Sequence, residues 1–114
     1  AQAEERSALM ACSALSNYLK FGVVSNAANF PDMTVMPRAG FPMRLTIPHR
    51  NVPGQLQVII DTVTKAGANI GPQHNDVKNG IGYCVVDLQQ PIDESRVERI
   101  RSQKNILGVR TFRF

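Results

Sequence analysis

The sequence predicts an α+β fold in which a four-stranded antiparallel sheet carries two helices on one face. From residue 41 onward, alternating apolar segments and segments of helical periodicity follow one another as strand, helix, strand, strand, helix, strand. One of these segments, Ile81 to Leu88, is apolar on both faces and is therefore expected at the centre of the sheet. The 114 residues, 43% hydrophobic and 19% charged, are typical of a globular chain that can bury a core.

The first forty residues are expected to form a helix followed by an irregular linker. Residues 2 to 20 have apolar side chains at helical spacing, and Gly22 follows as a termination signal. The stretch from there to Gly40 has no sustained period and is long for a loop inside a compact domain. We therefore divide the chain into the terminal helix of a preceding body with its linker (1–40) and a second domain (41–114).

The second domain begins with a predicted strand. Met43, Leu45 and Ile47 fall on one face of it. Arg44 and Thr46 fall on the other face, which predicts a half-buried strand with these polar residues exposed.

A helix is predicted between Pro53 and Gly67, which are a start and a stop signal. Its first turn has unpaired backbone N–H groups and a partial positive charge, and Gly54 there has no side chain to exclude a ligand. A carboxylate is the group that such a turn favours. The apolar stripe that we expect to be buried consists of Leu56, Ile59, Ile60 and Val63.

Two further strands are predicted after this helix. Asn69 to Val77 is the weaker one, and Pro72 within it cannot donate to a ladder, which places this strand at an edge. Asn79-Gly80 is a two-residue hairpin turn that leads into the strand Ile81 to Leu88.

The last two elements are a helix and a strand. Asp93 opens the helix, Val97 and Ile100 are its buried residues, and Asn105 is placed to stop it. Ile106 to Phe114 is expected to be the last strand. Two right-handed crossovers then give the strand order 4-1-3-2, the ferredoxin-like βαββαβ arrangement, with strands two and four at the edges.

No motif in the sequence indicates catalysis, nucleotide binding or metal binding. There is no nucleophile beside a general base, no His/Cys cluster with ligand spacing and no glycine-rich phosphate loop. We therefore assign no catalytic residue and no metal ligand, and we expect this chain, as a fragment, not to be an enzyme. Cys12 and Cys84 are expected to be buried and reduced, as in the cytoplasm, and His74 to be exposed or structural.

The charge and hydropathy of the chain favour neither nucleic acid nor a membrane as a partner. The net charge is +4 with the basic residues spread along the chain. No apolar run approaches the roughly 20 residues that a membrane span needs. The one dense basic group is read as a solvated helix face and consists of Arg96, Arg99, Arg101 and Lys104.

Three polar residues beside the predicted helix form a candidate binding site. His49 and Asn51 stand just before the helix, and Asn69 follows its stop signal. Taken singly, Asn51 can be a helix cap, His49 a loop residue at the end of a strand, and Asn69 a turn residue. Taken together, they are suited to a small polar molecule.

These residues occur in an order that resembles the ACT regulatory domain that ends many D-3-phosphoglycerate dehydrogenases. The preceding linker is also similar to the segment that joins the catalytic body of those enzymes to their regulatory domain. The motifs that carry the resemblance are His49-x-Asn51-x-Pro53-Gly54, Gly67-x-Asn69-Ile70, Gly82-Tyr83-x-Val85-Val86-Asp87 and, in the linker, Gly22-Val23-Val24-x-Asn26-Ala27-x-Asn29-Phe30-Pro31.

The resemblance implies a regulatory function. In that family the enzyme uses NAD in the first step of serine biosynthesis, and L-serine inhibits it by binding between two ACT domains. The resemblance places His49 and Asn51 of one subunit at the effector, with Gly54 and Ile70 beside them and Asn69 reaching across from the partner subunit. It also implies a homodimer paired through the edge strand, with NAD and the catalytic domains outside this chain.

Two residues depart from the family pattern, and two other functions stay open. Val52 stands where related sequences often have Arg, and Pro72 removes a donor from the pairing strand. One alternative is an ACT-type dimerisation module without a ligand. The other is an RNA-binding domain of the RRM type, which shares the strand order, although Tyr83 is the one residue left of the aromatics that such a domain stacks on bases.

Overall fold

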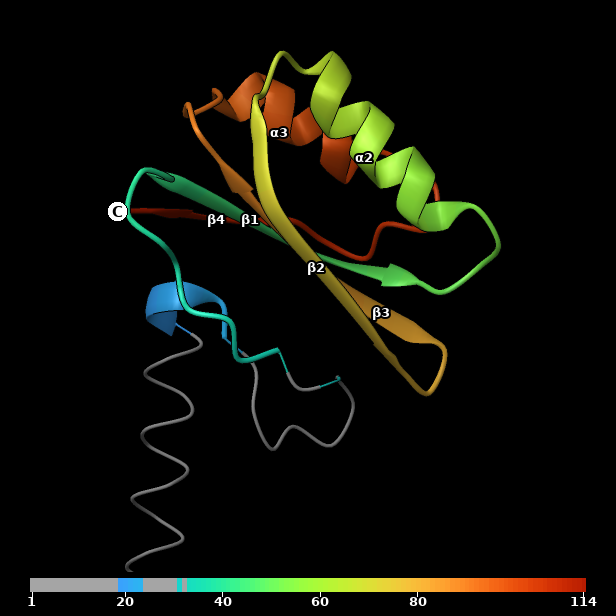
Figure 1. Cartoon of the computed structure of the whole chain (residues 1–114). Helices are drawn as coiled ribbons and strands as arrows, with labels where there is room; N and C mark the ends of the chain where they lie inside the picture. Colours follow the sequence, from blue (N-terminus) through green and yellow to red (C-terminus); the bar gives the residue numbers. More distant parts are fainter. Residues whose placement is uncertain (1–18, 24–30, 32) are drawn as a thin grey trace, which may run out of the picture.

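The computed structural model describes residues 19–23, 31 and 33–114 of the chain. The described sheet has the order β2-β3-β1-β4 with antiparallel pairs throughout, which confirms the predicted order and its two edges. Both helices cover the same face of this sheet (Figure 1). The elements are β1 (Met43–Arg50), α2 (Gln55–Lys65), β2 (Ile70–Lys78), β3 (Ile81–Leu88), α3 (Glu94–Arg101) and β4 (Arg110–Arg113).

Helix α2 begins two residues later than its proline predicts. Pro53 lies in a turn that the Gln55 N–H closes by donating to the Val52 carbonyl oxygen over 3.1 Å. Gly54 is the N-cap of the helix, with φ at +78°. A turn with proline second and a positive φ third is the type II turn, which favours glycine at that third position. The expectation of Pro53 as the first helical residue was wrong, and the turn gives Gly54 a structural reason of its own.

The buried stripe of α2 was predicted correctly except at its first member. Ile59 and Val63 are buried against the sheet and Ile60 is half-buried, but Leu56 is 42% exposed. Gln55 takes the buried place in the first turn, where its amide donates to the Lys104 carbonyl oxygen over 3.4 Å. Leu56 therefore points toward the surface at the start of the helix.

Strand β1 is buried on both faces, so the prediction of a half-buried strand was wrong. Arg44 is 0% and Thr46 is 1% exposed. The described part of residues 19–42 covers this second face of the sheet (Figure 1). Arg44 contacts Asp87 through Nε over 2.7 Å, and its Nη1 donates to the carbonyl oxygens of Phe21 and Val35.

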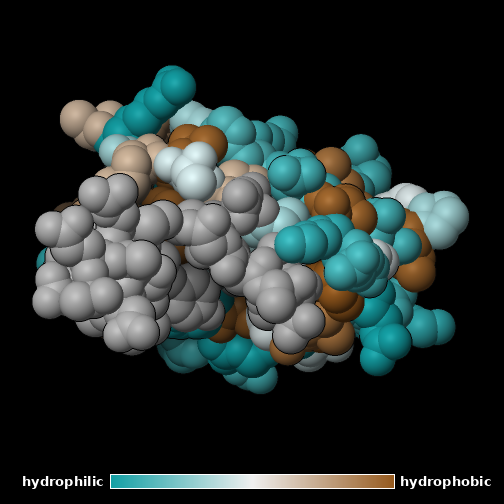
Figure 2. All heavy atoms as spheres, turned by 90° about the horizontal axis from the view of Figure 1, so that it is seen from below, coloured by the Kyte–Doolittle hydropathy of each residue, from teal (hydrophilic) through white to brown (hydrophobic). Residues whose placement is uncertain are grey.

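The N-terminal helix is described only at its end. Leu19 to Phe21 are helical, Gly22 follows with φ at +69° as a terminating glycine should, and the rest of the predicted helix, with Cys12, lies outside the described residues. The Tyr83 hydroxyl donates to the Gly22 carbonyl oxygen over 2.9 Å. The boundary near Gly40 stays a prediction. Figure 2 views this side of the molecule from below and shows hydrophobic residues interspersed among hydrophilic ones.

The C-terminal part follows the prediction in its helix and departs from it at the ends. Strand β3 has the predicted bounds, and α3 buries Val97 and Ile100 below an Asp93 N-cap. However, α3 ends at Arg101, and Asn105 lies beyond it in a turn with φ at +68°. The predicted role of Asn105 as the stop of this helix was therefore wrong.

The last strand is shorter than predicted because its first half is a loop held beside β1. The Leu107 N–H donates to the Pro48 carbonyl oxygen over 2.8 Å, and the Arg50 N–H donates to that of Asn105 over 2.9 Å. Ile106 makes an isolated bridge with His49, and the regular ladder starts only at Arg110. These single bonds fix the loop without forming a strand.

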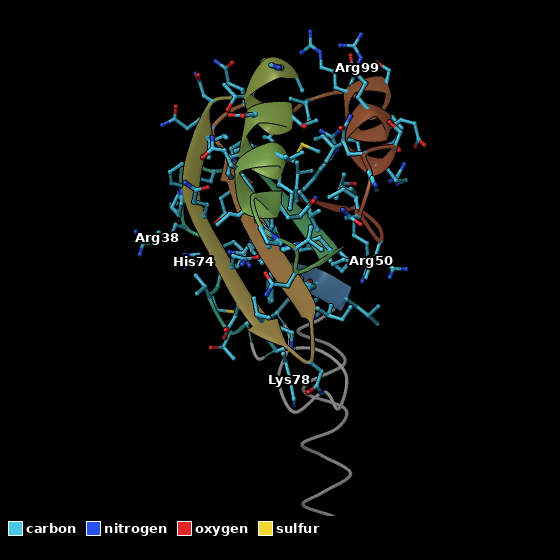
Figure 3. All side chains as sticks on the ribbon, turned by 90° about the vertical axis from the view of Figure 1, so that its right-hand side faces the viewer. Arg38, Arg50, His74, Lys78 and Arg99 are labelled. Carbon is cyan, nitrogen blue, oxygen red and sulfur yellow. The ribbon has the colours of Figure 1, made fainter. Side chains whose placement is uncertain are left out.

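The basic group on α3 is only partly a solvated face. Arg96 and Arg99 are exposed, and Arg99 projects away from the sheet (Figure 3). Arg101 is half-buried, pairs with Glu94 and Glu98, and donates to the Val109 carbonyl oxygen over 3.0 Å. This contact holds the approach to β4 against α3.

Candidate functional site

A hollow opens at the N-terminal end of α2, where the loop after β1 meets the edge strand β2. This first hollow is lined by Asn51, Val52, Pro53, Gly54, Gln55, Leu56, Gln57 and Asn75. A second hollow adjoins it and shares Leu56, Gln57 and Asn75 with it. The other residues that line the second hollow come from α2, β2 and β3.

The first turn of α2 presents unpaired donors to this hollow. No side chain caps the helix, and its first turn has no acidic residue. The Val58 N–H donates to the Gly54 carbonyl oxygen over 3.2 Å, whereas the N–H groups of Leu56 and Gln57 have no acceptor within the described part of the chain. Such N–H groups, together with the positive end of the helix dipole, favour an anion. The hollow is therefore suited to a carboxylate.

Two of the predicted site residues line the hollow. Asn51 and Gly54 are both exposed at its rim. Asn51 does not cap the helix; its backbone N–H donates to the Gly80 carbonyl oxygen over 2.9 Å, which ties the loop to the β2–β3 hairpin. The side chain of Asn51 is thereby held at the mouth of the hollow with no structural task in the helix.

His49 lies behind the hollow rather than in it. It belongs to β1, not to the loop, and is 1% exposed. Its Nε2 is 2.8 Å from Oδ1 of Asn75, and its Nδ1 is 3.1 Å from the Arg50 carbonyl oxygen. The ring also fills the space over Gly82, where a Cβ atom would come within 2.3 Å of it. Both ring nitrogens therefore have polar neighbours before any ligand arrives.

Asn69 and Ile70 lie at the other end of the sheet from His49. The register of β3 pairs Ile70 with Leu88, whereas His49 pairs with Gly82 near the opposite end of that strand. Asn69 is exposed, and its carbonyl oxygen accepts the Gln89 N–H over 3.0 Å. Ile70 is half-buried against the core. One chain by itself does not bring these two residues to the hollow.

Asn75 is a site residue that the sequence analysis missed. It is half-buried on β2, lines both hollows and contacts His49. The strand containing it has an irregular register between Ile70 and Gln73, next to Pro72, and carries few apolar residues. The register of β2 on β3 pairs Asn75 with Cys84, whose side chain belongs to the core on the helix side, so Asn75 lies on that side of the sheet. A strand register for β2 would have revealed it, but its sequence pattern is too weak to fix one.

Two further reactive groups, Cys84 and His74, line the second hollow. Cys84 is buried and free, as predicted, and burial raises the pKa of its thiol to about 12, which keeps it protonated at neutral pH. His74, labelled on the edge strand in Figure 3, is half-buried, and its Nε2 is buried with no hydrogen-bond partner among the described residues.

The described residues contain neither a metal-ligand cluster nor a membrane-spanning helix. Residues 19–23, 31 and 33–114 contain no group of three or more His, Cys, Asp or Glu side chains able to hold a metal ion. The described helices are all too short or too polar to cross a membrane.

The sequence is similar to D-3-phosphoglycerate dehydrogenases. It is 30% identical over 108 residues to D-3-phosphoglycerate dehydrogenase of Escherichia coli, and equally to that of Shigella flexneri. The match covers 94% of this chain but only 25% of each enzyme, so the chain spans a quarter of their length. No family model matches the sequence.

The structure is similar to solved ACT domains. The crystal structure of the ACT domain from GTP pyrophosphokinase of Chlorobium tepidum superposes with a TM-score of 0.52 at 17% identity, covering 63% of this chain and 97% of that one. Its solution structure gives a TM-score of 0.53 over the same share of this chain and 85% of that one. The chain thus has the ACT-domain fold and is related, over nearly its whole length, to the C-terminal part of D-3-phosphoglycerate dehydrogenases.

Proposed function

We propose that this domain is a sensor of L-serine that regulates a D-3-phosphoglycerate dehydrogenase. The hollow at the start of α2 is the effector site, and its occupancy inhibits the first step of serine biosynthesis in the cytoplasm. The observation that carries the proposal is the uncapped first turn of α2, whose free N–H groups open into a hollow rimmed by Asn51. The similarity to D-3-phosphoglycerate dehydrogenases is the reason for proposing L-serine as the amino acid.

The groups around the hollow match the two ends of an amino acid. The carboxylate binds the N–H groups of Leu56 and Gln57, and the amide of Asn51 lies within reach at the rim. Gly54 leaves the approach open, because no heavy atom beyond its two chain neighbours lies within 4 Å of where its Cβ would stand. The ammonium group needs an acceptor, and the side-chain carbonyl of Asn69 is the proposed one.

A second copy of the chain is required to bring Asn69 to the site. Strand β2 is an edge of the sheet. Antiparallel pairing of two β2 strands about a two-fold axis near His74 brings residue 69 of one copy level with residue 79 of the other. That is the end of the sheet where Asn51 lies, since the Asn51 N–H bonds to Gly80. The effector site therefore lies between two subunits, and Ile70 enters it with Asn69.

The catalytic part of the proposed enzyme lies outside this chain. The curated relatives are dehydrogenases about four times as long, since the match covers 25% of them. NAD and the catalytic residues belong to those other domains, and the present domain controls them through the way two subunits pair. The coupling free energy between two such sites is typically about 1–3 kcal/mol.

A dimerisation module without a ligand is the alternative function, and one observation favours it. Both nitrogens of His49 already face polar atoms of the same chain, so His49 offers no free nitrogen to an effector. The RNA-binding alternative has no such support. Tyr83 is 3% exposed under residues 19–23 and cannot stack on a base without displacing them.

Calorimetric titration of the chain with L-serine tests the proposal, with glycine and D-serine as controls and the molecular mass measured with and without ligand. We expect saturable binding of L-serine by a dimer. A dimer that gives no heat with any of the three amino acids would contradict the sensor and support the dimerisation module.

Replacement of Asn69 tests the intersubunit site. Asn69→Ala removes one charge-assisted hydrogen bond and is expected to weaken L-serine binding by roughly 1.5–3 kcal/mol, or about ten- to a hundredfold. The exposed Gln90→Ala is the matched control, since it shortens another amide side chain at the surface and should leave the affinity unchanged. Equal affinity of the two variants would remove Asn69 from the site.

A further inference from the structure

The ring of His49 is held in one position by its surroundings. It is 1% exposed, and a Cβ atom on Gly82 would stand 2.3 Å from its Cε1 and Nε2 atoms. A side chain at residue 82 would therefore displace the ring. With its place fixed, the state of His49 is decided by the atoms that its two nitrogens face.

Both nitrogens of His49 face an oxygen atom. Nδ1 is 3.1 Å from the Arg50 carbonyl oxygen, and Nε2 is 2.8 Å from Oδ1 of Asn75. A carbonyl oxygen only accepts, so Nδ1 carries a proton in the first contact. A second proton on Nε2 then satisfies Oδ1 of Asn75. A neutral ring instead requires the amide of Asn75 to turn and donate from Nδ2 to Nε2.

The two states leave different groups of Asn75 for the hollow. Asn75 lines that hollow together with Asn51 and Gly54. When His49 is protonated and holds the amide oxygen, the NH₂ group of Asn75 is left to join the N–H donors of the first turn of α2. When His49 is neutral and holds the NH₂ group, the amide oxygen is left, and an acceptor there repels a carboxylate.

We propose that Asn75 is an effector-binding residue whose donor group is presented to the carboxylate by protonated His49. The inference rests on the proposed function and adds to it a residue and a regulation by protons. Because an Asn75 amide with its NH₂ group toward the hollow leaves only its oxygen for Nε2, binding of the effector is coupled to the second proton on His49. His49 is thus a positioning residue, and Asn75 makes the contact.

Other titratable and charged groups lie on the elements around this pair. Arg50 follows His49 on β1, and Lys104 lies in the loop whose carbonyl oxygen binds Gln55. His74 and Asp76 flank Asn75 on β2, and Cys84 faces it on β3. His74 is the one other histidine of the chain, so the measurements are made on wild type and again in a His74→Gln background.

The first test needs no change at Asn75. L-serine is titrated calorimetrically in buffers of different ionisation enthalpy, and the ring ¹⁵N signals of His49 are recorded by NMR with and without L-serine. We expect proton uptake on binding, and His49 signals that move to those of an imidazolium when L-serine is added. Binding without proton uptake, or with His49 neutral in the complex, would overturn the proposal.

Two substitutions separate the donor from the acceptor of Asn75. Asn75→Ala is expected to weaken L-serine binding about tenfold and to abolish the proton uptake. Asn75→Asp keeps an oxygen for His49 but turns a negative oxygen toward the hollow, so it should weaken binding more than Ala does while His49 stays protonated. Gln90→Ala, which shortens an exposed amide outside both hollows, is the matched control and should bind as wild type does.

The outcomes distinguish this inference from the function on which it rests. If the wild-type chain does not bind L-serine, the proposed function fails and the inference fails with it. If wild type binds and Asn75→Ala binds equally well, the inference alone is overturned. Circular dichroism establishes that each variant is folded, and the wild-type proton measurement decides the question for any variant that is not.

Discussion

The two faces of the sheet are covered in different ways. On one face, α2 and α3 pack apolar side chains such as Ile59 and Val97 onto the strands. On the other face, the end of a helix (19–21) and residues without regular structure lie on the sheet around Arg44 and Asp87, which are 0% and 1% exposed.

The two faces differ because the segments that cover them satisfy their backbone N–H and carbonyl groups in different ways. A helix satisfies its own backbone groups, so it can be held by apolar area alone. A helix end and irregular chain bury carbonyl oxygens that need donors, and the Arg44 guanidinium donates to those of Phe21 and Val35. The helix face is therefore expected to respond to lost volume, and the other face to lost charge.

The largest effect is expected from breaking the buried ion pair. Asp87→Ala leaves the Arg44 charge buried without its partner and should lower the free energy of unfolding by about 3–5 kcal/mol. Chemical denaturation of wild type and variant measures the difference.

A double variant is the control for this effect. Arg44→Met combined with Asp87→Leu removes both charges while filling the space, and it should recover only part of the loss, because the carbonyl oxygens of Phe21 and Val35 lose their donor. A single variant as stable as wild type would mean that the pair does not hold this face.

The helix face should respond in proportion to the volume removed. Ile59→Ala is expected to lower the free energy of unfolding by about 2–5 kcal/mol and Ile59→Val by about 0.5–1.5 kcal/mol, because Ile59 is 1% exposed in the apolar core. Equilibrium unfolding in urea resolves the two steps. If Val is as damaging as Ala, the graded response expected of an apolar face is refuted.

Two glycines at the two ends of the predicted linker provide a matched pair. Gly22 and Gly40 both have positive φ, so replacement by alanine strains the backbone at each. A Cβ on Gly22 would also stand 2.5 Å from Cγ2 of Thr46 and 3.0 Å from a ring atom of Phe112, whereas nothing lies within 4 Å at Gly40.

The extra crowding sets the expected difference. Gly22→Ala should lower the free energy of unfolding by about 1–3 kcal/mol more than Gly40→Ala does. It should also increase hydrogen exchange at residues 19–23, as they lift from the sheet. Equal stability and exchange in the two variants would show that this segment does not pack tightly.

The smallest effect is expected from an exposed aspartate on the helix face. The N–H of Arg96 and the hydroxyl of Ser95 donate to Asp93 and hold the pKa of its carboxyl below its usual range. A lowered pKa in the folded state adds stability above the unfolded pKa, and that stability is lost as the pH falls through the folded value.

Thermal unfolding between about pH 6 and about pH 2 tests this contribution. Asp93→Ala should unfold at a slightly lower temperature than wild type at the upper end, and the two should converge in acid. Asp93→Asn, which keeps a cap without a charge, is the control. A constant difference across this range would exclude the carboxylate as the source of the effect.

The elements of the domain were predictable from local pattern, but their ends were not. Ile81 to Leu88 is a strand with the predicted bounds, because a segment that is apolar on both faces avoids water best at the centre of a sheet. Pro53 was a start signal, yet a type II turn displaced the helix by two residues. Asn105 takes its left-handed conformation in a turn beyond the helix, where its carbonyl oxygen binds Arg50. These ends depend on bonds to distant strands, which a local pattern does not contain.

The candidate site was predictable only where its residues are neighbours in sequence. Asn51 and Gly54 line the hollow because the loop and the helix that carry them are consecutive. Asn75 lies 26 residues from His49 in sequence, on a strand whose pattern is weak, and only the sheet register brings the two together. Asn69 lies at the other end of the sheet, so within one chain it does not join them.

By itself, the sequence determined the order of strands and helices, the central strand, most of the buried residues of both helices and the likeness to a regulatory domain. Only the tertiary structure decided that Arg44 is buried with Asp87 and that His49 lies behind the hollow. It also decided that Asn75 contacts His49 and lines the hollow. Periodicity reports which side of an element avoids water, because that preference is local. A polar residue is buried or exposed according to the partner that the fold brings to it, and that partner comes from another part of the chain.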